Sequence, residues 1–302
     1  MEPKKILMNL QWTGERLVTE LDSAYGTFEH LHRYALAIAL CKNKRVLDIA
    51  SGEGYGTSLI SKEADFVVGV DISEEAVKHA NEKYANNKIQ FKCGNAAAIP
   101  IESASVDVVV SFETIEHITG QEEFLREIKR VLTPSGMLII STPDKKIYTQ
   151  RDPDNSFHVK ELFTDEFALL IKKYFTFLKL YQQRNFVGSV ISEVSSNLGV
   201  YSFFDGDFSN IANELQEQEF FNKPFFNIIV ASNYKIPGSL VPVISLFSSY
   251  KAYEAERKNL LSQVDLNNQK LQLLMQSGRY KTYKWLINAV SLPARLLRRK
   301  NR

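Results

Sequence analysis

Glu113, Glu116 and His117 lie close enough in the sequence to act on one substrate. The spacing Glu-x-x-Glu-His places two carboxylates and an imidazole within about one helical turn. Oxygen ligands with one imidazole suit Mg²⁺ or Mn²⁺, and such a metal can polarise a hydroxyl group. A further histidine, His158, stands in the segment Asn-Ser-Phe-His and could return to the same pocket.

Three interpretations of this group stay open from the sequence. In the first, Glu113, Glu116, His117 and His158 form a divalent metal site that polarises an acceptor hydroxyl. In the second, His117 is a general base that needs no metal, with Glu116 beside it as a catalytic residue. In the third, the carboxylates only cap the helix that follows.

A glycine-rich turn follows a predicted strand at 45–49, and Gly52 and Gly54 stand in it. Glycine lets the backbone approach a ligand closely, and the next helix offers free N–H groups. Asp71 ends the next predicted strand about 20 residues later, where a carboxylate can accept both ribose hydroxyls. This combination predicts an adenosine ligand. The NAD fingerprint would need glycine or alanine where Thr57 stands, and the chain has no GxxxxGK[ST] phosphate loop.

Strands that alternate with helices would position these residues. Near-continuous apolar runs predict strands that are buried on both faces, at 45–49, 66–70, 89–93, 106–112 and 137–142. Two closing strands are expected at 176–180 and 225–231, and helices at 29–40, 73–85, 121–132 and 160–175. Alternating elements of this kind indicate βαβ units and an α/β fold around a parallel sheet.

The motifs resemble, in order, those of the class I S-adenosylmethionine (SAM)-dependent methyltransferases. They are RVLDIASGEGYG, VVGVDIS, GNAAAIP, VDVVVSFETIEHI and REIKRVLTPSGMLIISTP, and they span about residues 40 to 145. The resemblance implies a Rossmann-like, doubly wound and mostly parallel seven-stranded sheet. It also implies an enzyme that transfers the methyl group of SAM.

The same resemblance assigns roles within the cofactor site. Gly52 and Gly54 would line the methionine moiety, Asp71 would hold the ribose, and Asn95 with Ala96 would meet the adenine edge. The remaining candidate cofactor-binding residues are Asp48, Ala50, Ile72 and Phe112. The family usually has glycine where Ala50 stands, so Ala50 predicts ordinary backbone torsions at that position. Asn95 replaces a frequent aspartate and keeps an acceptor oxygen for the adenine amino group.

A longer pattern concerns the acceptor. TGERL, EHLHRY, IASGEGYG, SFETIEHI and NSFHVKEL, over about residues 13 to 185, resemble methyltransferases encoded with bacterial surface-polysaccharide pathways. This resemblance implies O-methylation of a sugar hydroxyl on a small-molecule or glycan acceptor. The Glu-x-x-Glu-His segment is also similar to that of ubiquinone-pathway and small-RNA 2′-O-methyltransferases, in which such residues coordinate a divalent cation. A quinone precursor, an RNA 2′-hydroxyl and a non-enzymatic SAM-binding scaffold are the alternatives; RNA is disfavoured because no basic stripe is evident.

The chain is expected to have three parts. Residues 1–43 form an N-terminal cap, 44–235 the methyltransferase domain with an insertion at about 188–223, and 248–302 a helical extension. Several polar and aromatic residues of the cap helix either cover SAM or serve packing and surface ion pairs: Glu29, His30, His32, Arg33 and Tyr34.

The extension combines two patterns. Apolar residues at roughly heptad spacing predict a coiled coil and a homo-oligomer, although Arg257 and Asn267 interrupt the seam of Leu260, Val264, Leu271 and Leu274. The tail at 279–302 is basic, bears a tryptophan and is amphipathic, which suits docking on anionic lipid. A solvated or partner-binding helix is the alternative.

Composition sets the remaining bounds. The net charge of +2 over 302 residues does not indicate a nucleic-acid-coating protein. We expect a cytoplasmic protein, at most peripheral on the inner face of the membrane, because no secretory signal or membrane-spanning run is evident. Cys41 and Cys93 are expected to be reduced thiols in buried segments.

Overall fold

The computed structural model describes residues 24–151, 155–184, 204–206, 211–213, 225–236 and 250–276. The chain divides into two compact units, residues 1–247 and 248–302. Among the described residues, no helix combines the length and apolarity that a bilayer crossing requires.

The first unit is built on a seven-stranded sheet with the strand order β3-β2-β1-β4-β5-β9-β6. The strands are β1 (Arg45–Ile49), β2 (Phe66–Asp71), β3 (Ile89–Cys93), β4 (Val106–Ser111), β5 (Leu132–Pro143), β6 (Phe177–Gln183) and β9 (Phe226–Ser232). The first five pair in parallel, whereas β9 pairs antiparallel with both β5 and β6. The prediction of a mostly parallel, Rossmann-like sheet of seven strands is confirmed.

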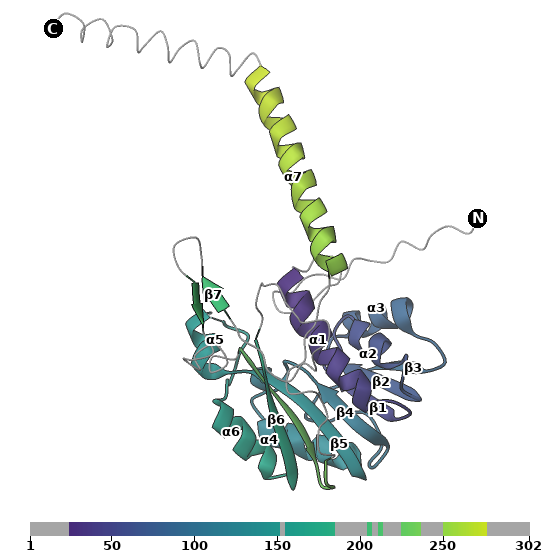
Figure 1. Cartoon of the computed structure of the whole chain (residues 1–302). Coiled ribbons are helices and arrows are strands. Elements are labelled where there is room, and N and C mark those ends of the chain that lie inside the picture. Colours follow the sequence, from purple (N-terminus) through teal and green to yellow (C-terminus); the bar gives the residue numbers. More distant parts are fainter. Residues whose placement is uncertain are drawn as a thin grey trace, which may run out of the picture. The chain divides into compact units, whose positions relative to one another are not determined.

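Helices cover both faces of this sheet (Figure 1). One face carries α1 (Ala24–Leu40), α2 (Tyr55–Ile60) and α3 (Glu74–Tyr84), and the other carries α4 (Gln121–Val131) and α6 (Thr164–Lys172). A short 3-10 helix, η1 (Ile115–His117), follows β4, and α5 (Lys145–Arg151) follows β5. Two short strands, β7 (Phe204–Gly206) and β8 (Ile211–Asn213), pair antiparallel within the expected insertion.

Most of the apolar runs form strands with both faces buried, but the expectation was wrong for β3, an edge strand in which buried and exposed residues alternate. Alternate residues of β1 show the two buried faces, since Leu47 packs on the α4 side of the sheet and Val46 packs on the α1 side. Phe124 and Ile128 of α4 are fully buried on the side of the sheet where Leu47 packs. Burial of side chains of this size contributes roughly 1.5–3 kcal/mol each.

The helix start expected at 73 and the two expected closing strands are also observed. Ser73 caps α3, because its hydroxyl accepts a hydrogen bond from the backbone N–H of Ala76 at 3.2 Å. The two closing strands form as β6 and β9.

Other expectations were wrong. The helix expected over 160–175 begins only at Thr164, where the backbone N–H of Phe163 donates to Glu166 Oε2 at 3.1 Å. Cys93 is exposed, because it ends the edge strand β3, whereas Cys41 is buried as expected. Burial raises the pKa of the Cys41 thiol to about 12.

The second unit contains α7 (Tyr250–Gln276), a single helix of 27 residues. Every side chain that the structure describes in it, from Arg257 onward, is exposed, including the predicted seam of Leu260, Val264, Leu271 and Leu274. The basic tail at 279–302 and most of residues 1–43 and 188–223 lie outside the described residues. The three boundaries expected from the sequence therefore stay predictions.

Candidate active site

The candidate residues gather at the carboxyl edge of the sheet. The chain order of the strands reverses between the neighbours β1 and β4, and open α/β sheets bind ligands outside the strand ends at such a point. The turn after β1, Asp71 at the end of β2, and η1 after β4 all stand at this edge.

The turn after β1 has an unusual backbone. Ala50, Gly52 and Gly54 have φ angles of 60°, 54° and 92°, so three alternate residues adopt the left-handed conformation. The expectation of ordinary torsions at Ala50 is therefore wrong. The turn keeps its shape although a Cβ atom stands at its first left-handed position, where an L-residue is strained.

Close packing also restricts this turn. A Cβ atom on Gly54 would lie 2.8 Å from Cβ of Ala80 and 2.9 Å from the ring of Phe91. A Cβ atom on Gly56 would lie 2.0 Å from the ring of Tyr34. These glycines therefore allow α3, β3 and α1 to approach the turn closely.

Asp71 joins the turn to the start of α3. Its Oδ2 accepts from the backbone N–H of Gly52 at 2.8 Å, and its Oδ1 accepts from the N–H of Ser73 at 2.9 Å. A carboxylate offers about four acceptor sites, so each oxygen can still accept a ribose hydroxyl. The geometry is compatible with the role that the sequence suggested.

Asp48 stands beneath the turn and is buried. Its Oδ2 accepts from the hydroxyl of Thr57 at 2.6 Å, and its Oδ1 accepts from the hydroxyl of Tyr34 at 3.4 Å. Burial raises the pKa of Asp48 to about 7, and the charge of Asp71 adds to the increase. Asp48 thus contacts residues that support the turn.

The other cofactor candidates lie in different surroundings. Ile72 is 72% exposed beside Asp71, which suits contact with one face of an adenine. Asn95 Oδ1 accepts from the backbone N–H of Ala97 at 2.8 Å, so this oxygen stabilises its own turn, next to half-buried Ala96. Phe112 packs against Tyr34, with ring centroids 5.1 Å apart, and forms part of the core.

Helix α1 brings a buried charge to the same edge. Arg33 is 1% exposed, donates from Nη1 to Gln183 Oε1 at 2.7 Å, and stacks over Phe226 with 4.6 Å between the guanidinium and the ring centroid. Among the described residues, its Nε and Nη2 have no hydrogen-bond partner. Buried guanidinium groups usually have partners, so these nitrogens can receive an anionic ligand.

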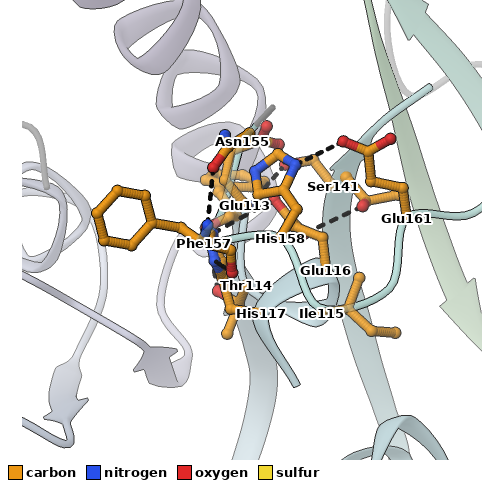
Figure 2. A network of polar contacts seen from close by, with 12 residues as sticks. Glu113, Thr114, Ile115, Glu116, His117, Ser141, Asn155, Phe157, His158 and Glu161 are labelled. Atoms are coloured by element: carbon orange, nitrogen blue, oxygen red, sulfur yellow. Dashed lines mark hydrogen bonds and ion pairs between the residues drawn. The ribbon is translucent and has the colours of Figure 1, made fainter. Parts of the chain in front are cut away.

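Two distant histidines meet after β4. Glu116, His117 and His158 each offer a ligand atom, and these atoms all lie within 4.8 Å of one another. The backbone explains the meeting, because the carbonyl of Glu116 accepts from the N–H groups of Val159 and Lys160 at 2.9 and 3.0 Å. The 155–160 segment is thereby held against η1 (Figure 2).

In each histidine, a contact at the Nδ1 atom fixes the direction in which the Nε2 atom points. Nδ1 of His117 lies 3.0 Å from the carbonyl oxygen of Phe157, and Nδ1 of His158 lies 2.7 Å from Oε1 of Glu161. When both Nδ1 atoms carry the proton, both Nε2 atoms present a lone pair. Metal-binding histidines use the same arrangement, in which a carbonyl or carboxylate accepts from the second nitrogen.

Glu116 is 1% exposed and shares this cluster. Its Oε2 accepts from the hydroxyl of Thr142 at 3.0 Å, and its Oε1 has no hydrogen-bond partner among the described residues and lies 3.9 Å from Nε2 of His117. Burial raises the pKa of Glu116 well above its ordinary value, and the charge of Glu113 raises it further. A cation at Oε1 would compensate for the buried charge.

Glu113 has a different environment. Its Oε1 accepts from the hydroxyl of Ser141 at 2.5 Å, and its backbone has a φ of 50°. In the described part of the chain, the group of ligand atoms contains Glu116, His117 and His158 but not Glu113. The structure therefore unites three of the four residues suggested for a metal site.

The sequence reasoning did not identify the residues that orient the cluster. Glu161 stands three positions after His158, a spacing that could have indicated a histidine–carboxylate pair. Thr142 and the carbonyl of Phe157 gave no recognisable signal, because their roles depend on how separate segments meet.

Comparisons with known proteins agree with this fold. Residues 47–140 match the family model described as a methyltransferase domain. A probable SAM-dependent methyltransferase of Mycobacterium tuberculosis is 41% identical over 165 residues, which cover 54% of this chain and 60% of that protein. A ubiquinone biosynthesis O-methyltransferase of Coxiella burnetii is 24% identical over 139 residues, which cover 43% of this chain and 58% of that protein.

A sterol 4-C-methyltransferase of Caenorhabditis elegans is 31% identical over 165 residues, covering 52% of this chain and 46% of that protein. The matches to these three relatives thus span less than two thirds of each relative's length. Among solved structures, a Pyrococcus horikoshii protein has a TM-score of 0.51 and 21% identity, over 70% of this chain and 92% of that one. The sheet order, the turn after β1 with Asp71, and these matches agree: residues 47–140 match a methyltransferase domain, and the chain is similar to SAM-dependent methyltransferases.

Proposed function

We propose that this protein transfers the methyl group of SAM to a hydroxyl oxygen of a sugar, on a small-molecule or glycan acceptor. The observation that carries the proposal is the cluster of Glu116, His117 and His158 beside the cofactor edge of the sheet. A hydroxyl acceptor must lose its proton during transfer, and this cluster supplies groups that can promote that loss.

In the proposed complex, the turn with Gly52 and Gly54 lies against the methionine part of SAM, and Asp71 accepts from the ribose hydroxyls. Nε and Nη2 of Arg33, which lack hydrogen-bond partners among the described residues, would donate to the carboxylate of the methionine part. The acceptor oxygen attacks the methyl carbon in line with the carbon–sulfur bond. The electron pair of that bond returns to sulfur and gives S-adenosylhomocysteine, while the acceptor proton leaves to a base.

We propose that Glu116, His117 and His158 hold Mg²⁺ or Mn²⁺, with Glu113 as a neighbouring charge. The donor set fits, because one carboxylate oxygen lacks a partner and both imidazoles are oriented through their Nδ1 atoms. A bound divalent cation would lower the pKa of a coordinated hydroxyl. Without a metal, Nε2 of His117 would accept the proton directly as a general base.

A metal assay distinguishes these mechanisms. Loss of activity in EDTA and its recovery with Mg²⁺ or Mn²⁺ would support the metal, whereas full activity in EDTA would leave His117 as a base. The variant His158→Gln removes a ring that presents Nε2, and it should weaken Mn²⁺ binding measured by paramagnetic resonance. His79→Gln is the matched control, since His79 lies on α3 and outside the cluster.

The acceptor class rests on further features. The half-buried ring of Tyr148 lies beside His158, with centroids 5.0 Å apart, and Phe226 follows at 6.4 Å from Tyr148. A row of rings next to the cluster suits the apolar face of a sugar. The ubiquinone relative keeps a quinone precursor as an alternative acceptor.

Labelled SAM tests the reaction and the acceptor together. The protein would be incubated with nucleotide sugars, lipid-linked glycans and a hydroxylated quinone precursor, and release of S-adenosylhomocysteine would be measured. Methylation of a sugar is expected. Turnover only with the quinone precursor would contradict the proposed acceptor, and SAM binding without turnover on any of them would favour a scaffold.

We also propose that α7 mediates a homo-oligomer and that the tail at 279–302 contacts anionic lipid at the inner face of the membrane. The exposed leucines of α7 support the first proposal. The basic and aromatic composition of the tail supports the second. Flotation with anionic liposomes should recover the full chain but not a variant that lacks 279–302; equal recovery of both would contradict lipid contact.

A further inference from the structure

Glu53 is the one charged side chain in the turn between Ala50 and Gly56, and it is buried. Its side chain is 1% exposed although it stands between two glycines at a ligand-binding edge. A buried carboxylate is retained only when partners compensate for its lost hydration. The identity of those partners indicates what the residue does.

Three residues of α3 contact the Glu53 carboxylate. Nζ of Lys83 forms an ion pair with Oε1, the hydroxyl of Tyr84 donates to the same oxygen at 3.4 Å, and Nε2 of His79 lies 3.7 Å away. Burial alone would lower the pKa of Lys83, but the hydrogen bond and charge of Glu53 outweigh burial and raise it. Lys83 therefore carries its charge at neutral pH.

Helix α3 thus holds the turn from two sides. At the start of α3, the backbone N–H of Ser73 donates to one oxygen of Asp71. The backbone N–H of Gly52, in the turn, donates to the other oxygen of the same carboxylate. Near the end of α3, Lys83 holds Glu53, and between them Ala80 packs where Gly54 lacks a Cβ atom. The turn is therefore held at one point by Asp71, which would bind ribose, and at another by Lys83 near the end of α3.

We propose that Glu53 is a positioning residue for SAM, whose ion pair with Lys83 fixes the turn that receives the methionine part of the cofactor. This inference rests on the proposed SAM site. Asp71 would hold the ribose directly, so the Glu53–Lys83 pair governs chiefly the contacts that the turn makes with the amino-acid portion. Small displacements of such backbone contacts are costly, because close approach allows little adjustment.

Two ligands separate positioning from general stability. S-adenosylhomocysteine carries the amino-acid portion, whereas methylthioadenosine keeps the nucleoside and lacks that portion. We expect Glu53→Gln and Lys83→Met each to weaken S-adenosylhomocysteine binding roughly 10-fold while changing methylthioadenosine binding less than about twofold. The double variant should bind S-adenosylhomocysteine about as well as either single variant, because both changes remove one interaction.

The control is Lys173→Met, which removes a lysine paired with Glu122 at 2.7 Å on the surface and should leave both affinities unchanged. Lys83→Arg keeps the positive charge and should retain most of the affinity for S-adenosylhomocysteine. It is the variant to measure if the other variants fold poorly. Equal weakening of both ligands, or no weakening, would overturn the inference. If the unmodified protein binds neither ligand, the proposed SAM site itself fails and the inference fails with it.

Discussion

Ala50 and Glu113 both adopt positive φ angles, 60° and 50°, in the loops after β1 and β4. Neither is glycine, so both positions are strained, and strain of this kind tends to occur where a site must hold a fixed shape. The sequence could not predict this feature, because a residue type alone does not reveal that its neighbours force it into a disfavoured conformation.

Replacing Ala50 with glycine should stabilise the domain. The left-handed conformation costs an L-residue about 1–2 kcal/mol, and the extra freedom of an unfolded glycine costs about 0.5–1 kcal/mol. We expect Ala50→Gly to raise the free energy of unfolding by roughly 0.5–1 kcal/mol in urea titrations. Ala85→Gly is the control, because Ala85 has a φ of −60° and should lose stability instead; a decrease for Ala50→Gly would contradict the strain.

Asp48 predicts how stability depends on pH. Its folded pKa of about 7 lies above the ordinary value of 3.8, so the folded state binds this proton more tightly than the unfolded state. The contribution of Asp48 to stability is therefore fully present below about pH 4 and is lost as pH rises to about 7, by at most about 1.4 kcal/mol per pH unit.

Urea unfolding at pH 5, 6, 7 and 8 tests this account against Asp48→Asn. The variant should gain stability relative to the unmodified protein as pH rises from 5 to 7, and the gain should level off above 7. Asp107→Asn is the matched control, because the hydrogen bond from Arg45 lowers the pKa of Asp107 and keeps it ionised over this range. A difference for Asp48→Asn that stays constant with pH would be inconsistent with a raised pKa.

At the scale of elements, the candidate site depends on segments that meet without a sequence signal. The motif around His117 and the later His158 could both be recognised, but their meeting depends on backbone hydrogen bonds to the carbonyl of Glu116. Main-chain carbonyls carry no residue identity, so this docking could not be read from residue types. The position of α1 over the turn after β1 depends in the same way on the contact between Tyr34 and Gly56.

The packing of α1 gives a steric prediction. A Cβ atom on Gly56 would lie 2.0 Å from the ring of Tyr34, so Gly56→Ala should displace α1, lower the melting temperature by several degrees and weaken SAM binding. The double variant with Tyr34→Ala should be no less stable than Tyr34→Ala alone. Gly120→Ala should have little effect, since its nearest neighbour is the end of the Glu123 side chain at 3.1 Å; equal losses from both glycine variants would refute the steric explanation.

At the scale of the whole molecule, much of the fold was predictable because β1, β2, β4 and the second half of β5 are apolar and buried on both faces. The turn after β1 and Asp71 were recognisable for the same reason, since both follow such strands directly. The order of the last two strands was not predictable, because β9 enters between β5 and β6 through pairing that apolar runs alone do not specify. Domain boundaries in weakly patterned segments had no comparable physical signal.

The exposed apolar seam of α7 predicts association of the full chain. If the seam of Leu260, Val264, Leu271 and Leu274 pairs with a second copy, the chain should sediment as an oligomer, and Leu271→Lys should shift it toward a monomer. Leu273→Lys is the control, because Leu273 is 68% exposed and lies outside that seam. A full chain that sediments as a monomer at micromolar concentration would contradict association through α7.

Calorimetric titration of S-adenosylhomocysteine into the full chain, its Asp71→Asn variant and its Asp107→Asn variant tests the central claim most directly. Both changes convert an aspartate to its amide on the same sheet, but Asp71 ends β2 at the cofactor edge whereas Asp107 pairs with Arg45 at the other end of its strands. The account predicts binding by the unmodified protein, at least roughly 10-fold weaker binding by Asp71→Asn and unchanged binding by Asp107→Asn. No binding by the unmodified protein, or equal binding by all three, would contradict it.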